Sequence, residues 1–87
     1  MILENLLNKY KKLIQDNSLL PNSFHILWMC DKLSDRREAF DIADYFKINR
    51  WLGFIQGYLY SNKLKSIDEL RNETRGIDDE LLGELCK

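Results

Sequence analysis

The stretch from Arg36 to Ser61 contains no proline and no cluster of turn-forming residues. Its apolar side chains recur at the spacing that places residues on one face of a helix. They form two successive stripes, which are Ala39, Ile42, Ala43 and Phe46, and then Ile48, Trp51, Leu52, Ile55 and Leu59. Either one long, curved helix changes the face that it buries, or Asn49 marks a break between two helices of a kinked pair. We favour the single long helix.

Helical patterns also precede this stretch. Residues 2–16 place leucine, isoleucine and tyrosine on one side and mainly lysine and asparagine on the other, which predicts an amphipathic helix. Pro21 then ends the pattern, because proline cannot occupy a helix interior. The run from Phe24 to Cys30 is apolar nearly all round, which predicts a second helix that is buried on most sides.

The last third of the chain has clear capping signals. Ser66 and Glu69 have the spacing of a capping box, which predicts the start of a short helix. We expect this helix to end at Gly76, with another short helix after it. No repeat and no strand pattern is found. The sequence therefore predicts one all-α domain over residues 1–87, a compact bundle of about four to six helices.

Composition narrows the class of protein. The formal net charge is −1 and 45% of the residues are hydrophobic, as in ordinary globular proteins. Cys30 and Cys86 form no CxxC pair, so we interpret both as reduced thiols of a cytoplasmic protein. The sequence contains neither a recognisable signal peptide nor an apolar stretch long enough to cross a bilayer. We therefore expect a soluble protein with no membrane association.

No group of residues has the spacing of a catalytic or metal site. His25 is the only histidine and lies in an apolar run, where we expect a core or boundary residue. The chain has no HExxH, GxSxG or glycine-rich phosphate-binding motif. We therefore expect a protein that is not an enzyme and that holds no metal and no cofactor.

Gly53 and Gly57 stand out because they lie inside the predicted long helix. A glycine in a helix interior costs about 1 kcal/mol relative to alanine. With 100° of rotation per residue, both glycines fall on the polar side, opposite an apolar arc that includes Trp51, Phe54 and Tyr58. The polar residues and glycines that we expect to contact a partner are Asn49, Arg50, Gly53, Gln56, Gly57 and Tyr60.

Two explanations of this glycine face remain open. Small residues allow another helix to approach closely, either from the same chain, such as the first helix, or from a second copy. Alternatively, the bare backbone forms the floor of a shallow groove, and Arg50 and Gln56 at its walls recognise a ligand or a partner segment.

A nucleic-acid interface is the alternative function. Its cations would be Arg36, Arg37, Lys63, Lys65, Arg71 and Arg75. Acidic residues interrupt both groups of cations, and the net charge is small for a chain that binds phosphates. A self-assembling protein that forms a homodimer through the glycine face is the second alternative.

The segment KINRWLGFIQGYLYSNKLKSIDELRNETR, from Lys47 to Arg75, resembles a pattern found in small proteins of tailed bacteriophages. The matching blocks are Arg50 to Gly57 and Ile67 to Arg71, followed by Thr74 and Arg75. The resemblance covers about a third of the chain and brings no established activity with it. It implies a phage protein in the bacterial host cytoplasm. Phage proteins of this size often modulate a host protein in host takeover or counter-defence. We therefore expect a small non-enzymatic interaction protein that binds and modulates a host or phage protein.

Overall fold

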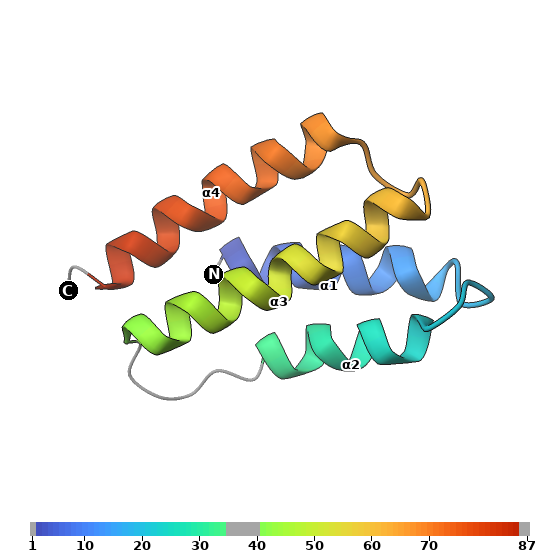
Figure 1. Cartoon of the computed structure of the whole chain (residues 1–87), viewed down its shortest axis with the longest axis horizontal. Coiled ribbons are helices and arrows are strands. Elements are labelled where there is room, and N and C mark those ends of the chain that lie inside the picture. Colours follow the sequence, from blue (N-terminus) through green and yellow to red (C-terminus); the bar gives the residue numbers. More distant parts are fainter. Residues whose placement is uncertain (1, 35–40, 86–87) are drawn as a thin grey trace.

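Four α-helices make up most of the computed structural model, which describes residues 2–34 and 41–85. They are α1 (Ile2–Gln15), α2 (Ser23–Ser34), α3 (Ile42–Ser61) and α4 (Ile67–Leu85), and the described residues contain no strand. Successive helices run in opposite directions (Figure 1). α1 packs against both α2 and α4, and α3 also packs against both α2 and α4. The predicted all-α bundle with one long central helix is confirmed.

One apolar stripe from each helix builds the core. The spacing of these residues along each helix keeps them on a single face, as expected for helices that are half exposed to solvent. The buried apolar residues are Leu3, Leu6, Leu7, Tyr10 and Ile14 of α1, Ile26, Met29, Cys30 and Leu33 of α2, Ile48, Leu52, Ile55 and Leu59 of α3, and Leu70, Ile77 and Leu81 of α4.

The central helix is continuous from Ile42 to Ser61, as favoured, so the alternative of a break at Asn49 is wrong. The Asn49 side chain instead donates a hydrogen bond to the carbonyl oxygen of Tyr45, one turn earlier in the same helix. Asp41 caps the helix, because its carboxylate accepts from the Asp44 amide while its own amide donates to the Asp44 carboxylate.

The first predicted stripe of α3 is not buried. Its members Ile42 and Phe46 are exposed, while Ala39 lies outside the described residues. The helix does not change the face that it buries, because the core side is set by Ile48 and the residues that follow it.

Burial of α2 differs from its prediction. The helix is apolar nearly all round, yet Phe24 is 82% exposed and Trp28 is also exposed. His25 is exposed rather than in the core, and its ring stacks on that of Trp28 with 5.7 Å between the ring centroids. The reason is geometric: among the described helices α2 packs only against α1 and α3, and none of them covers its outer side.

The last two predicted short helices are one helix, α4, of 19 residues. The helix that begins at Ile67 does not end at Gly76. Gly76 lacks the positive φ that a glycine has when it caps the C-terminus of a helix. Ile77 and Leu81 continue the buried stripe begun by Leu70. Burial of these side chains outweighs the weak helix propensity of the glycine.

The start of α1 is capped by a residue from the other end of the chain. The amides of Ile2 and Leu3 donate to the Glu80 carboxylate of α4 at 3.1 and 3.0 Å. The first amides of a helix have no acceptor within the helix, and a negative charge there also interacts favourably with the helix dipole. Glu80 thus joins the first helix to the last.

Glu80→Ala should lower the free energy of unfolding by about 1–2 kcal/mol, because it removes both acceptors. Urea denaturation followed by circular dichroism measures this. Asp79→Ala is the matched control, since Asp79 is the exposed acid next to Glu80 on the same helix, and it should change stability little. Equal losses in the two variants would contradict a capping role for Glu80.

Candidate partner-binding surface

The predicted glycine face lies mostly on the outside of α3. Arg50, Gly53, Gly57 and Tyr60 are exposed, and a Cβ atom added at either glycine would meet no atom within 4 Å. The glycines therefore do not serve a close approach by another helix of this chain, and that explanation is wrong for the described residues. A second copy and a groove remain as explanations.

A groove of about 300 Å³ lies between α3 and α4 next to Gly57. From α3 it is lined by Gln56, Gly57 and Tyr60, and from α4 by Ile67, Leu70, Arg71 and Thr74. Three residues of the predicted partner-binding set therefore meet in one concavity. Asn49, Arg50 and Gly53 lie elsewhere on α3 and do not line it.

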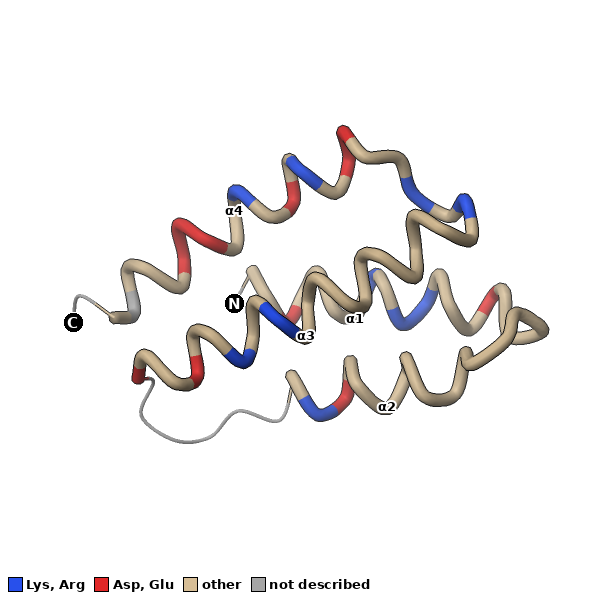
Figure 2. The backbone as a smooth tube through the Cα atoms, in the orientation of Figure 1, with Lys and Arg blue, Asp and Glu red and all other residues tan. Residues whose placement is uncertain are grey.

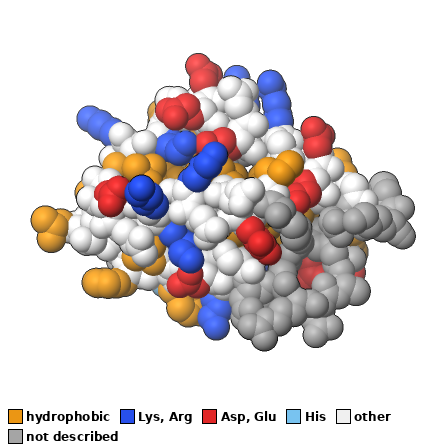
Figure 3. Space-filling model, turned by 180° about the vertical axis from the view of Figure 1, so that it is seen from behind, with side chains coloured by type: hydrophobic (Ala, Val, Ile, Leu, Met, Phe, Trp, Pro, Cys, Tyr) orange, Lys and Arg blue, Asp and Glu red, His pale blue; other side chains and the backbone are white. Residues whose placement is uncertain are grey.

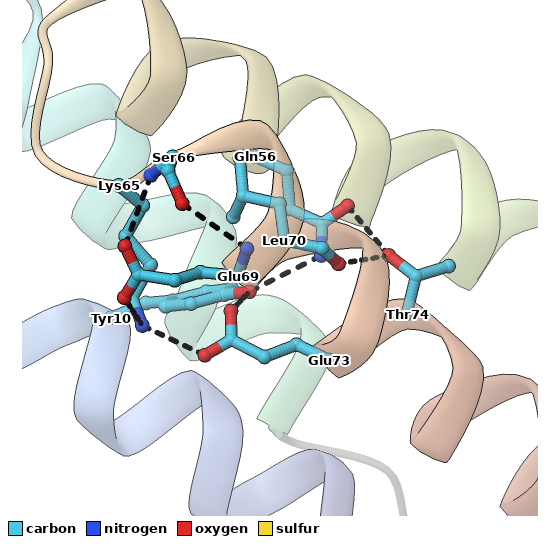
Figure 4. Close-up of polar contacts among 8 residues, drawn as sticks. All are labelled: Tyr10, Gln56, Lys65, Ser66, Glu69, Leu70, Glu73 and Thr74. Atoms are coloured by element: carbon cyan, nitrogen blue, oxygen red, sulfur yellow. Dashed lines mark hydrogen bonds and ion pairs between the residues drawn. The ribbon is translucent and has the colours of Figure 1, made fainter.

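Gln56 has a structural role behind this groove that its sequence position did not indicate. Its side-chain nitrogen donates to the Tyr10 hydroxyl at 3.2 Å, and its oxygen accepts from the Thr74 hydroxyl at 3.1 Å (Figure 4). The Tyr10 hydroxyl in turn donates to the Glu73 carboxylate at 2.7 Å. Gln56 therefore ties α1, α3 and α4 together, so its amide is already engaged at the groove wall.

The connection between α3 and α4 is fixed by charge. The Lys65 ammonium lies 2.7 Å from the Glu73 carboxylate and 3.7 Å from that of Glu69 (Figure 4). The predicted capping box is present, and its hydrogen bonds from Ser66, together with nearby Lys65, lower the pKa of Glu69. These contacts hold one end of the groove in place, which reduces the entropy that a partner must remove on binding.

The residues of the alternative nucleic-acid interface do not form a uniform positive surface. Lys65 is committed to Glu73, while Lys63, Arg71 and Arg75 are exposed. Cations and acids alternate along α4 (Figure 2), and they are interspersed on the face seen from behind (Figure 3). Arg36 and Arg37 lie outside the described residues.

An aromatic surface across α2 and α3 was missed by the sequence analysis. The rings of Trp28 and Trp51 lie 5.8 Å apart, measured between their centroids. The Lys32 ammonium lies 5.9 Å from the Trp28 ring centroid, and the Lys47 ammonium lies 5.0 Å from that of Trp51. Phe54 was expected in the apolar arc but is 60% exposed. The signal in the sequence was the spacing of each lysine four residues from its tryptophan.

Within residues 2–34 and 41–85, no three His, Cys, Asp or Glu side chains are grouped so that they could hold a metal ion. Among the helices that the structure describes, none is both long and apolar enough to traverse a membrane. Cys30 is buried with a free thiol, and Cys86 lies outside the described residues.

Comparison with known proteins identifies no relative of this chain. No protein-family model matches the chain, and neither a curated protein nor a solved structure matches it.

Proposed function

We propose that this chain is a small, non-enzymatic interaction protein that binds another protein through the outer face of α3 and the adjoining α3–α4 groove, and thereby modulates it. The resemblance to tailed-phage proteins supports a host or phage protein in the bacterial cytoplasm as the partner.

The observation that carries the proposal is the setting of Gly57. It has no neighbour within 4 Å that an added Cβ would meet, and it lines a groove beside Tyr60 and Ile67. Inside a helix, an exposed glycine weakens stability without any return from packing in the chain itself. A partner that packs closely against the bare backbone at Gly57 would explain why a glycine is present at this position.

The residues around this point suit a protein partner. Tyr60 is 51% exposed, and Ile67 beside it is exposed as well. Arg71 also lines the groove. Tyrosine and arginine are among the residues that most often dominate binding energy at interfaces, and an apolar neighbour helps to exclude water from their contacts.

The test is an affinity pull-down of the tagged protein from bacterial lysate, with and without nuclease, read by mass spectrometry. We expect a stoichiometric protein partner that survives nuclease and is lost with Gly57→Leu, because the added side chain occupies the groove. Gly83→Leu is the matched control, since Gly83 is also an exposed helical glycine with no atom within 4 Å of an added Cβ and does not line the groove. Circular dichroism verifies that both variants stay helical.

Three outcomes contradict the proposal. Partners that vanish with nuclease favour the nucleic-acid alternative, because they are held through phosphate contacts. A partner retained by both leucine variants excludes the groove. Light scattering that shows a dimer in the parent and a monomer only in Gly57→Leu, with no other protein captured, favours the self-assembling alternative.

A further inference from the structure

We propose that a second surface, formed by Phe24, Trp28 and Lys32 of α2 and by Lys47, Trp51 and Phe54 of α3, binds an acidic amphipathic helix of a partner protein. We call it the tryptophan surface. It lies on the side of α3 that faces α2, whereas the groove of the proposed function lies on the side that faces α4.

The apolar part of this surface is larger than packing within the chain requires. Phe24 and Phe54 are exposed, and Trp28 keeps 48% of its surface in contact with solvent. Trp28 and Trp51 bridge the two helices with their rings 5.8 Å apart. Aromatic residues gathered on one exposed face are typical of interaction sites, because each buries a large area with few rotatable bonds.

The charges of the tryptophan surface are of one sign and lie toward one end. Lys32 is near the end of α2 and Lys47 is in the second turn of α3, and the end of α2 lies beside the first half of α3 (Figure 2). Neither lysine takes part in an ion pair among the described residues. Asp31, the acid next to Lys32, pairs instead with Lys11 of α1 at 2.7 Å. A complementary partner carries carboxylates at one end and apolar side chains along the rest.

A helix suits this surface as a partner. An amphipathic helix carries its apolar residues along one face, and that face can pack against exposed aromatic side chains. Carboxylates at one end of the helix would reach the ammonium groups of Lys32 and Lys47. Each ammonium has three donors, so a contact with a tryptophan ring leaves others for a carboxylate.

The same contacts argue against bases stacking here. A base needs an open ring face, but the Trp28 ring is stacked by His25 and has the Lys32 ammonium 5.9 Å from its centroid. The Lys47 ammonium lies over the Trp51 ring. An anionic lipid surface is also disfavoured, because membrane-binding basic patches contain about 4–8 cations and this surface has two lysines.

Selection of a displayed library of random peptides against the full-length protein tests the proposal. We expect enriched peptides to combine apolar residues at helical spacing with glutamate or aspartate near one end. The two tryptophans of the chain both lie in the tryptophan surface, so synthetic versions of these peptides should change the intrinsic fluorescence on titration.

Charge variants locate the binding site. Lys32→Glu/Lys47→Glu should weaken peptide binding at least about tenfold, because attraction becomes repulsion. The matched control is Lys9→Glu/Lys12→Glu, which makes the same change of charge at exposed positions of α1 and should leave affinity nearly unchanged. Replacing the peptide carboxylates by lysine should restore binding to the first variant. Gly57→Leu should have no effect on the peptides, which separates this surface from the groove.

The proposal is overturned if no peptide is enriched, or if the enriched peptides are basic or insensitive to the charge of Lys32 and Lys47. It is also overturned if oligothymidylate or vesicles of phosphatidylserine and phosphatidylcholine change the fluorescence at lower concentrations than the peptides do. Loss of peptide binding in Gly57→Leu alone would place the peptides in the groove and would leave the tryptophan surface without a ligand.

Discussion

Raising the pH from 9 to 12 should lower the free energy of unfolding by several kcal/mol, because burial raises the pKa of the Cys30 thiol from 9.0 to about 12. The nearby charge of Asp31 adds to the rise. Burial also raises the pKa of the Tyr10 hydroxyl well above its ordinary value, and the Glu73 carboxylate adds to that rise. Both groups are more acidic in the unfolded chain than in the folded one.

The sign follows from proton binding. Above pH 9 the unfolded chain loses the thiol proton while the folded chain keeps it, so the unfolded state binds fewer protons and becomes relatively more stable. The same applies to the Tyr10 hydroxyl above pH 10. Each group alone gives a slope of about 1.4 kcal/mol per pH unit. The stabilisation is fully present below the unfolded pKa values and decreases as the pH rises toward the folded ones.

Urea denaturation at a series of pH values between neutral and strongly alkaline measures this slope. Cys30→Ala and Tyr10→Phe should each make it shallower, whatever their effect on stability at neutral pH. A slope that is the same in the parent and in both variants would show that neither group keeps its proton in the folded state.

Replacing all four glycines by alanine should stabilise the protein by about 2–4 kcal/mol, since each exchange within a helix is worth about 0.5–1 kcal/mol. The four are Gly53 and Gly57 of α3 and Gly76 and Gly83 of α4. None has a positive φ, and an added Cβ meets nothing within 4 Å at any of them. The alanine side chains therefore bring helix propensity without a steric penalty.

Thermal unfolding measures this effect, at about 4–8 °C in Tm for each kcal/mol. The two pairs serve as controls for one another, because Gly53→Ala/Gly57→Ala and Gly76→Ala/Gly83→Ala change the same number of residues on different helices. Similar gains are expected. Destabilisation by the α3 pair alone would reveal a close contact from outside the single chain, as in a homodimer that packs on these glycines.

Periodicity in the sequence was enough to predict the helices that have one clear apolar stripe. In α1 and in α3 from Ile48 onward, the predicted stripe is the buried one apart from the half-buried Trp51, since each helix presents one face to the core. The sequence could not show how many neighbours a helix has. The number of neighbouring helices explains why Phe24 of α2 and Phe54 of α3 are exposed although their surroundings in the sequence are apolar.

Contacts between residues that are far apart in the sequence could not be predicted from local patterns either. Local signals placed an end at Gly76, but the helix continues because Ile77 and Leu81 are buried against the other helices. Gln56 was predicted to face a partner because it lies on a polar arc. Its hydrogen bonds to Tyr10 and Thr74 depend on the way in which three helices meet.

The bond between Glu80 and the start of α1 has a consequence for the order in which the protein is made. α1 leaves the ribosome before α4, and its local pattern allows it to form early. The carboxylate that accepts from Ile2 and Leu3 is 78 and 77 residues further along the chain, respectively. Until Glu80 emerges, the opening turn of α1 lacks these acceptors and frays. The opening turn of α1 is thus completed only after most of α4 has been synthesised.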